Sequence, residues 1–134
     1  MYVFLSSDCS KEYFPSNTPS NFTCILPKRM ELSGNWEVAL MQIEYPSSAQ
    51  SARVNVYTDI INNVMYGDDM IPILRRINVL AKGKFININV PFYMPLNKDY
   101  IDQISIHIMG DTKVTHSFSS NPLKCTLHFR KCLQ

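Results

Sequence analysis

The feature that most constrains this chain is an alternation of apolar and polar residues with a period of two. Its clearest case is the run Ile104, Ile106 and Ile108, which Ser105 and His107 interrupt. Successive side chains of a β-strand point to opposite faces, so this pattern predicts a strand with one buried face. A helix repeats every 3.6 residues or so and would scatter the isoleucines around its axis. The alternation therefore predicts an all-β protein.

The same period recurs along the chain and predicts eight strands. Residues 123–129 alternate in this way, and residues 86–90 do so up to Pro91, which cannot donate a hydrogen bond to a neighbouring strand. Turn-forming residues bound five further apolar segments, at residues 2–6, 22–26, 36–43, 54–58 and 73–80. Short helical turns are expected at residues 59–65 and 98–102.

Chain length and connection length narrow the architecture. The 134 residues suit a single domain over residues 1–134, and eight strands in that length close either as a jelly-roll sandwich or as an up-and-down barrel. Residues 8–21 and 45–53 are too long for hairpin turns, whereas an up-and-down barrel uses mostly short ones. These two connections favour a single jelly-roll β-sandwich of about eight antiparallel strands.

The charge and the apolar runs argue against several kinds of partner. The chain has 13 basic and 11 acidic residues, and a net charge of +2 gives no basic arm for direct nucleic-acid binding. No apolar run approaches the ~20 residues of a membrane span, and no secretory leader is expected. Cys9, Cys24, Cys125 and Cys132 lack CxxC spacing. Cys24 and Cys125 fall inside apolar alternations, which suits small buried thiols in a reducing compartment.

Residues that often carry chemistry do not form a convincing site, so we expect no enzyme, metal or cofactor. Gly67-Asp68-Asp69 resembles the metal-binding turn of RNA-dependent polymerases, but such an enzyme is several times longer, and a surface turn explains the residues. The chain's histidines are His107, His116 and His128. The first and last lie on the polar phase of predicted strands, facing away from the interior where a cupin holds its metal.

Apolar residues in excess of one buried face point to contacts with other chains. Residues 36–43 carry Trp36 in one phase and both Met41 and Ile43 in the other, a pattern typical of a strand covered on both sides. Either a crossing segment of the same chain or a neighbouring subunit supplies the second cover. The segment Tyr93-Met94-Pro95-Leu96 has a composition enriched at protein contacts, although packing on the end of the sandwich also explains it.

Several segments together resemble the capsid proteins of Polinton (Maverick) elements and the related adintoviruses. The similar blocks are Trp36-Glu37-Val38-Ala39-Leu40, Ile43-Glu44-Tyr45-Pro46, Val56-Tyr57-Thr58-Asp59-Ile60-Ile61, Gly67-Asp68, Pro72-Ile73-Leu74-Arg75, Pro91-Phe92-Tyr93-Met94-Pro95-Leu96, residues 104–111 and Leu127-His128-Phe129-Arg130. Such elements encode a double jelly-roll major capsid protein and a smaller single jelly-roll penton protein. The length of this chain fits the smaller of the two.

The resemblance implies a non-enzymatic virion protein, a minor capsid or penton protein made in the host cell nucleus or cytoplasm. It would form homopentamers at the icosahedral vertices beside the major capsid trimers. The residues expected to help build subunit interfaces are Trp36, Met41, Ile43, Tyr57, Tyr93 and Met94. A β-sandwich binding module that recognises a carbohydrate or host protein through its end loops is the main alternative, and a small cupin-like metalloenzyme is a third.

Overall fold

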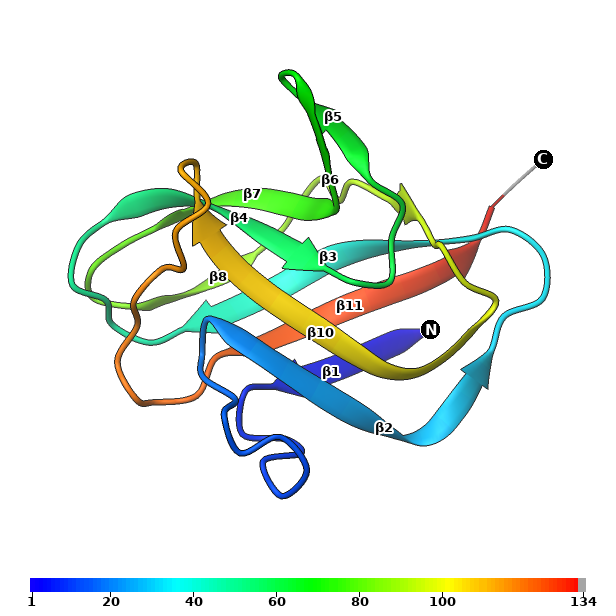
Figure 1. The fold of residues 1–134 in the computed structure, drawn as a ribbon, viewed down its shortest axis with the longest axis horizontal. Coiled ribbons are helices and arrows are strands. Elements are labelled where there is room, and N and C mark those ends of the chain that lie inside the picture. The colour runs from blue at the N-terminus through cyan, green and yellow to red at the C-terminus, as the bar shows by residue number, and fades with distance from the viewer. Residues whose placement is uncertain (133–134) are drawn as a thin grey trace.

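The computed structural model describes residues 1–132, which form strands, turns and connections without any helix (Figure 1). The strands are β1 (Tyr2–Ser6), β2 (Asn21–Glu31), β3 (Trp36–Tyr45), β4 (Ala52–Thr58), β5 (Val64–Tyr66), β6 (Asp69–Ile71), β7 (Ile73–Val79), β8 (Lys84–Asn87), β9 (Met94–Pro95), β10 (Tyr100–Gly110) and β11 (Lys124–Lys131). All the paired strands are antiparallel. The prediction of an all-β, antiparallel protein is confirmed.

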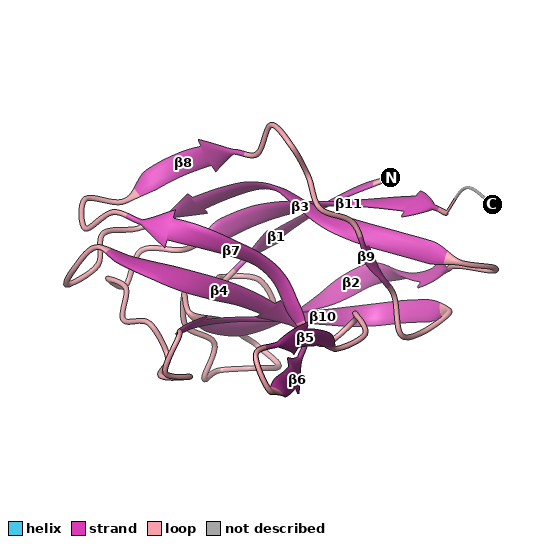
Figure 2. Ribbon diagram, turned by 90° about the horizontal axis from the view of Figure 1, so that it is seen from above, coloured by secondary structure: helices cyan, strands magenta, loops and turns pink. Residues whose placement is uncertain are grey.

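The longer strands form two sheets that face each other (Figure 2). Sheet A has the order β1-β11-β3-β8, with β9 also paired to β3, and sheet B has the order β2-β10-β4-β7. Apart from the short β5, β6 and β9, the first strand thus pairs with the last, the second with the second-to-last, and so on inward to β4 and β7. Each segment predicted as a strand overlaps one of these eight strands.

The core lies between the two sheets and is built from the alternating residues of both. Ile104, Ile106 and Ile108 on β10 are fully buried, as are Leu127 and Phe129 on β11. Burying a side chain of this size contributes roughly 1.5–3 kcal/mol to folding. The inward phase that the sequence predicts is therefore the phase that holds the sheets together.

Strand β3 follows only in part the prediction that both of its faces need a cover. The pairing of β3 with β11 shifts register between Leu40 and Gln42, which leaves Met41 as an extra residue. A β-bulge of this kind moves the residues after it to the other phase. Val38 before the bulge and Ile43 after it consequently both lie in the core, at 0% and 1% exposed. The expected second cover is therefore not needed for Ile43, which the bulge directs into the same core as Val38, whereas Ala39 on the other face is also 0% exposed, beside the crossing segment that carries β9.

The two predicted helical turns are also wrong. The backbone of residues 59–65 does not bond to itself, because Asn62 N donates to Pro95 O at 3.1 Å. Asn97 N donates to Ile60 O at 2.9 Å, and Asn97 Nδ2 donates to Ile61 O at 3.0 Å. Residues 98–102 meanwhile run into β10 at Tyr100. Residues 60–62 thus bond to Pro95 and Asn97, whereas Tyr100 and Ile101 pair with β2, so neither segment forms a helical turn.

The strand predicted at residues 86–90 ends early. Strand β8 stops at Asn87, after which Ile88 N donates to Met41 O at 2.8 Å. Val90, predicted to be buried, is 68% exposed. The bond from Ile88 continues the register of β8 with β3, and Ile88 is still buried, so the chain leaves the sheet only beyond this residue.

The β5–β6 hairpin covers part of the outer face of sheet B (Figure 2). A second apolar cluster lies beneath it, formed by the buried residues Tyr57, Ile71 and Ile73 with Val64 and Tyr66 packed against them. Figure 1 shows the hairpin rising from the body of the molecule. The chain thus closes this side of sheet B with one of its own segments.

Candidate functional site

The six residues predicted to build an interface are distributed unevenly by the fold. Trp36, Met41, Tyr93 and Met94 are partly exposed. Ile43 belongs to the core between the sheets, and Tyr57, at 7% exposed, lies under the β5–β6 hairpin. Ile43 and Tyr57 therefore offer almost no surface to a partner. The bulge in β3 directs Ile43 into the core, and the β5–β6 hairpin, which the sequence did not predict, covers Tyr57.

Tyr93 is fixed to the outer face of sheet A by contacts within the chain. Its hydroxyl shares a hydrogen bond of 2.8 Å with Nδ1 of His128, and the Arg130 guanidinium stacks on its ring at 3.5 Å. Arg130 Nε in turn donates to Glu37 Oε1 at 2.8 Å. Burial, then the positive charges of the N-terminus and Arg130, lower the pKa of His128, which favours its neutral form. Tyr93 therefore holds a crossing segment in place over one end of the sheet.

The rest of this face exposes aromatic side chains. Tyr2 and Phe4 on β1 are 58% and 74% exposed, and Phe85 on β8 is 52% exposed. Monomeric proteins expose few large aromatic side chains side by side, and such patches mark contact sites. We call this surface, formed by Tyr2, Phe4, Met41 and Phe85, the A-face groove.

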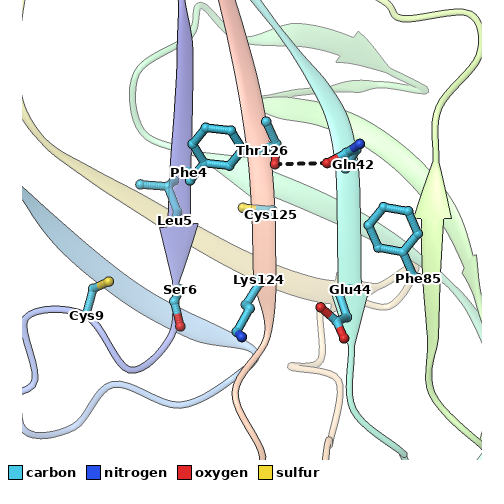
Figure 3. Close-up of a pocket in the computed structure, with 10 residues that line it drawn as sticks. All are labelled: Phe4, Leu5, Ser6, Cys9, Gln42, Glu44, Phe85, Lys124, Cys125 and Thr126. Atoms are coloured by element: carbon cyan, nitrogen blue, oxygen red, sulfur yellow. Dashed lines mark hydrogen bonds between the residues drawn. The ribbon is translucent and has the colours of Figure 1, made fainter.

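The floor of the A-face groove is polar and crosses the sheet in register. Phe4 pairs with Thr126, Thr126 with Gln42, and Gln42 with Asn87, so the row crosses β1, β11, β3 and β8. Figure 3 shows Phe4 and Phe85 on either side of the bonded pair Thr126 and Gln42, whose Oγ1 donates to Oε1 at 3.4 Å. Two adjoining hollows of about 280 and 450 Å³ share Phe4, Gln42 and Thr126. Apolar walls over a floor with free hydrogen-bonding capacity suit a protein contact.

The sequence contained a signal for these aromatic residues that the prediction did not use. Tyr2 and Phe4 occupy the phase opposite to Val3 and Leu5, so β1 is apolar in both phases. β1 is an edge strand whose partner β11 keeps regular register beside it, so no bulge brings the second phase inward. Both β1 and β3 thus carry apolar residues in both phases. In β1 this pattern results in an exposed apolar face, whereas in β3 it accompanies a bulge.

The β5–β6 hairpin presents a second exposed apolar surface. Met65 and Met70 are directly paired across its two strands and are 83% and 54% exposed. The connecting residues are Gly67, with a φ of +65°, and Asp68. A positive φ at the first central residue is what a tight hairpin turn of this length requires. Methionine side chains at such a tip adapt readily to a partner surface.

Ionic contacts hold this hairpin against the body of the protein. Arg76 Nη2 donates to both carboxylate oxygens of Asp111, at 2.9 and 2.7 Å, and the Tyr66 hydroxyl donates to the same carboxylate at 2.8 Å. Lys113 pairs with Asp69, and this pairing lowers the pKa of Asp69. The polymerase-like Gly-Asp-Asp sequence is thus a hairpin tip whose last carboxylate is ion-paired, as a surface turn predicts.

A third hollow lies beside the hairpin, over sheet B. Its volume is about 260 Å³, and Val64, Phe92, Met94 and Arg75 contribute to its lining. Asn55 on β4 also lines it and is 0% exposed, yet neither its Oδ1 nor its Nδ2 has a hydrogen-bond partner within the described residues. A buried amide without partners is costly, so this group is suited to a water molecule or a polar ligand atom.

The histidines and acidic residues do not gather into a metal centre. Within residues 1–132, no three side chains of the ligating types lie close enough to hold an ion. His107 shares a hydrogen bond of 2.9 Å with Thr115, and burial lowers the pKa values of both His107 and His116. Among those same residues there is also no helix of a length and apolarity that would let it span a bilayer.

No family model matches this chain, and no curated protein is significantly similar to it.

Proposed function

We propose that this chain is a structural virion protein, a single jelly-roll penton or minor capsid protein that forms homopentamers at icosahedral vertices beside double jelly-roll major capsid trimers. One observation carries the proposal. The chain exposes two unlike apolar surfaces, the A-face groove on sheet A and the hairpin over sheet B, on opposite sides of the sandwich (Figure 2). Such an arrangement favours repeated head-to-tail contact between copies.

The strand order supports the jelly-roll part of the proposal. Pairing the first strand with the last and the second with the second-to-last, in two facing sheets, is what results when a long antiparallel ribbon is rolled up. Jelly rolls occur in viral capsids, lectins and cupins, so this topology alone does not select a function. The choice among them rests on the exposed surfaces and on the resemblance of the sequence to Polinton and adintovirus capsid proteins.

The two surfaces are suited to a closed ring. A contact between different surfaces of identical chains generates a ring when the rotation closes, and five copies fill a fivefold vertex. The hairpin tip carries the exposed, acidic Asp68, and Lys124 lines the A-face groove together with Glu44. The contact we propose pairs Asp68 with Lys124, which orients one copy on the next. We therefore assign the contact to the hairpin of one copy and the A-face groove of the next.

Molecular mass in solution tests the proposed ring. We expect the purified protein to have the mass of a pentamer by light scattering at raised concentration, and to appear as fivefold rings in electron micrographs. Phe4→Ser with Phe85→Ser, or Met65→Ser with Met70→Ser, should yield folded monomers. Tyr13→Ser removes an aromatic residue that is 66% exposed outside both surfaces, so this control should leave the pentamer intact. A wild-type protein that stays monomeric, or forms rings of another order, contradicts the proposal.

Mixing the two double variants tests the head-to-tail contact directly. The variant with the altered groove retains an intact hairpin, and the variant with the altered hairpin retains an intact groove. Together they have one complementary pair of surfaces, so we expect a one-to-one heterodimer in the mixture. A contact between two identical surfaces would instead leave one of the variants self-associated, and no heterodimer would form.

The hollow with Asn55 favours a second candidate function, that of a binding module. An unpartnered amide next to Phe92 and the Arg75 side chain, which stacks on that ring at 4.1 Å, offers polar and aromatic contacts of the kind that bind sugars or peptides. A glycan array would test this function. Saturable binding that Asn55→Leu abolishes, by a protein that remains monomeric, would favour the binding module over the shell protein.

A further inference from the structure

Cys9 and Cys24 both donate a hydrogen bond to the same backbone oxygen, that of Ser6. Cys9 N donates to Ser6 O at 3.0 Å, and Cys24 Sγ donates to the same oxygen at 3.2 Å. The Cys24 sulfur therefore lies within two hydrogen-bond lengths of the Cys9 backbone, a separation that the short cysteine side chain can bridge. Figure 3 shows the Cys9 sulfur turned from its loop toward β1. All four cysteines of the chain are free thiols in this structure.

The loop that carries Cys9 is fixed to β2 on both sides of Cys24. Asn17 Nδ2 donates to Cys9 O at 3.2 Å and to Thr23 O at 2.9 Å, and Thr23 N donates back to Asn17 Oδ1 at 3.0 Å. On the other side, Ile25 N donates to Ser10 Oγ at 2.8 Å. These contacts hold the backbone on both flanks of the pair, so bringing the two sulfurs together needs side-chain rotation rather than movement of the sheet.

We propose that Cys9 and Cys24 form a reversible disulfide that joins the β1–β2 connection to β2, with a small dissolved disulfide such as oxidised glutathione as the oxidant. Cys9 is exposed and Cys24 is buried, so Cys9 reacts first. Its thiolate attacks one sulfur of oxidised glutathione, the sulfur–sulfur bond breaks, and the departing glutathione thiolate takes up the proton that Cys9 lost.

The second step closes the link within the chain. The Cys24 thiolate attacks the Cys9 sulfur of the mixed disulfide, and the second glutathione leaves and takes up the Cys24 proton. Two thiols have then been oxidised to one disulfide, and one oxidised glutathione has been reduced to two thiols. Burial, more than the nearby Cys9, raises the pKa of Cys24 to about 11, so this step should accelerate as the pH rises.

The other cysteines provide a competitor and a control. Cys125 lies near Cys24, but it is fully buried on β11, and burial raises its pKa to about 12. Cys132 lies beyond β11, where its backbone N donates to Asn35 O. The inference does not depend on the proposed shell function, although a link that forms outside reducing compartments would suit a particle that leaves the cell.

Peptide mapping tests the inference. The reduced, full-length protein is equilibrated with defined mixtures of reduced and oxidised glutathione, quenched with acid, and digested without reductant. We expect a peptide pair joined through Cys9 and Cys24, two hydrogens lighter than the reduced pair. Cys9→Ser and Cys24→Ser should each abolish it, and Cys132→Ser should leave it unchanged. A Cys24–Cys125 link, or glutathione that remains on Cys9 without a link in the chain, would overturn the inference.

Thermal unfolding gives a second readout, and it does not require the variant Cys24→Ser, which changes a buried residue. A disulfide that closes a loop of about 15 residues restricts the unfolded chain, and we expect the Tm of the oxidised protein to exceed that of the reduced protein by about 10 °C. Cys9→Ser changes an exposed side chain, so this variant should fold and should show the same Tm in both buffers. Equal Tm values for the oxidised and reduced wild-type protein would count against the link.

Discussion

The outer faces of the two sheets differ in how much of their apolar surface the chain itself covers. On sheet B, Tyr57 and Ile73 point outward but are covered by the β5–β6 hairpin and are less than a tenth exposed. On sheet A, Phe4 and Phe85 point outward and remain more than half exposed, although the Tyr93 segment covers one end of that face. One sheet is therefore completed within the chain, whereas the other retains apolar surface that a partner can bury.

The difference shows that an outward apolar residue has no fixed role in this fold. The same kind of side chain contributes to stability under the hairpin and contributes an exposed contact surface in the A-face groove. The hairpin itself links the two cases, because its inner side covers sheet B while Met65 and Met70 face solvent. Mutations in matched pairs can therefore separate folding from assembly.

The largest expected difference is between the losses in the free energy of unfolding caused by Tyr57→Ala and by Phe4→Ala. Tyr57→Ala should lower the free energy of unfolding by about 3–4 kcal/mol, because it leaves a cavity under the hairpin. Phe4→Ala should change it by less than about 0.5 kcal/mol, since the ring is largely in water already. Urea denaturation of the monomer followed by circular dichroism measures both values. Equal losses for the two variants would remove the distinction between the faces.

Two glycines in turns should differ in how much stability is lost when each is replaced by alanine: Gly83 between the two sheets and Gly67 at the tip of the hairpin. A Cβ on Gly83, which has a φ of +79°, would lie 2.8 Å from Tyr45 O, so Gly83→Ala should cost about 2–3 kcal/mol through strain and a clash with backbone. Gly67→Ala adds strain but meets no atom within 4 Å, and should cost about 1 kcal/mol. Chemical denaturation of both variants gives the comparison, and a larger loss for Gly67→Ala would contradict it.

The hydroxyl of Tyr93 tests how firmly the crossing segment is held on sheet A. Tyr93→Phe removes the hydrogen bond to His128 and keeps the ring beneath the Arg130 guanidinium, so we expect a loss of about 1 kcal/mol. Tyr13→Phe provides a control at an exposed tyrosine and should have no measurable effect. If Tyr93→Phe is equally neutral, packing rather than the hydrogen bond holds the segment.

The smallest expected effect is a loss of stability in mild acid. Burial lowers the pKa values of His107, His116 and His128 from their ordinary value of 6.5, so the unfolded chain binds protons more readily than the folded one. Their contribution is complete above pH 6.5 and declines as the pH falls through the lowered values. Thermal unfolding across this range measures the decline, and His107→Gln should make it shallower. Stability that rises on acidification through this range would show that the histidines are not responsible.

Much of the fold could be predicted because alternation is a local property. The isoleucines of β10 point inward wherever that strand pairs, so their spacing alone predicted strand and burial. The bulge at Met41 could not be read in the same way, because it appears as an apolar residue out of phase until the register with β11 is known. The hairpin was missed because its strands of three residues are too short to show a period, although Gly67 and Asp68 indicated a turn.

The candidate site was less predictable than the fold. Exposed Phe4 and buried Val38 give similar local patterns, and the neighbouring strands decide which side of each is covered. The meeting of Cys9 with Cys24 left no signal in the sequence, because it depends on the path of a connection that folds back onto the edge of β2. Site prediction failed where the relevant contact joined residues far apart in the chain.

The sequence by itself determined that this protein is built from antiparallel strands and which residues of most strands point inward. Only the tertiary structure decided which outer face is covered, because covering depends on pairings as distant as β1 with β11 and on where the hairpin comes to lie. Side-chain direction follows from backbone geometry within a few residues, whereas exposure depends on every segment that packs nearby.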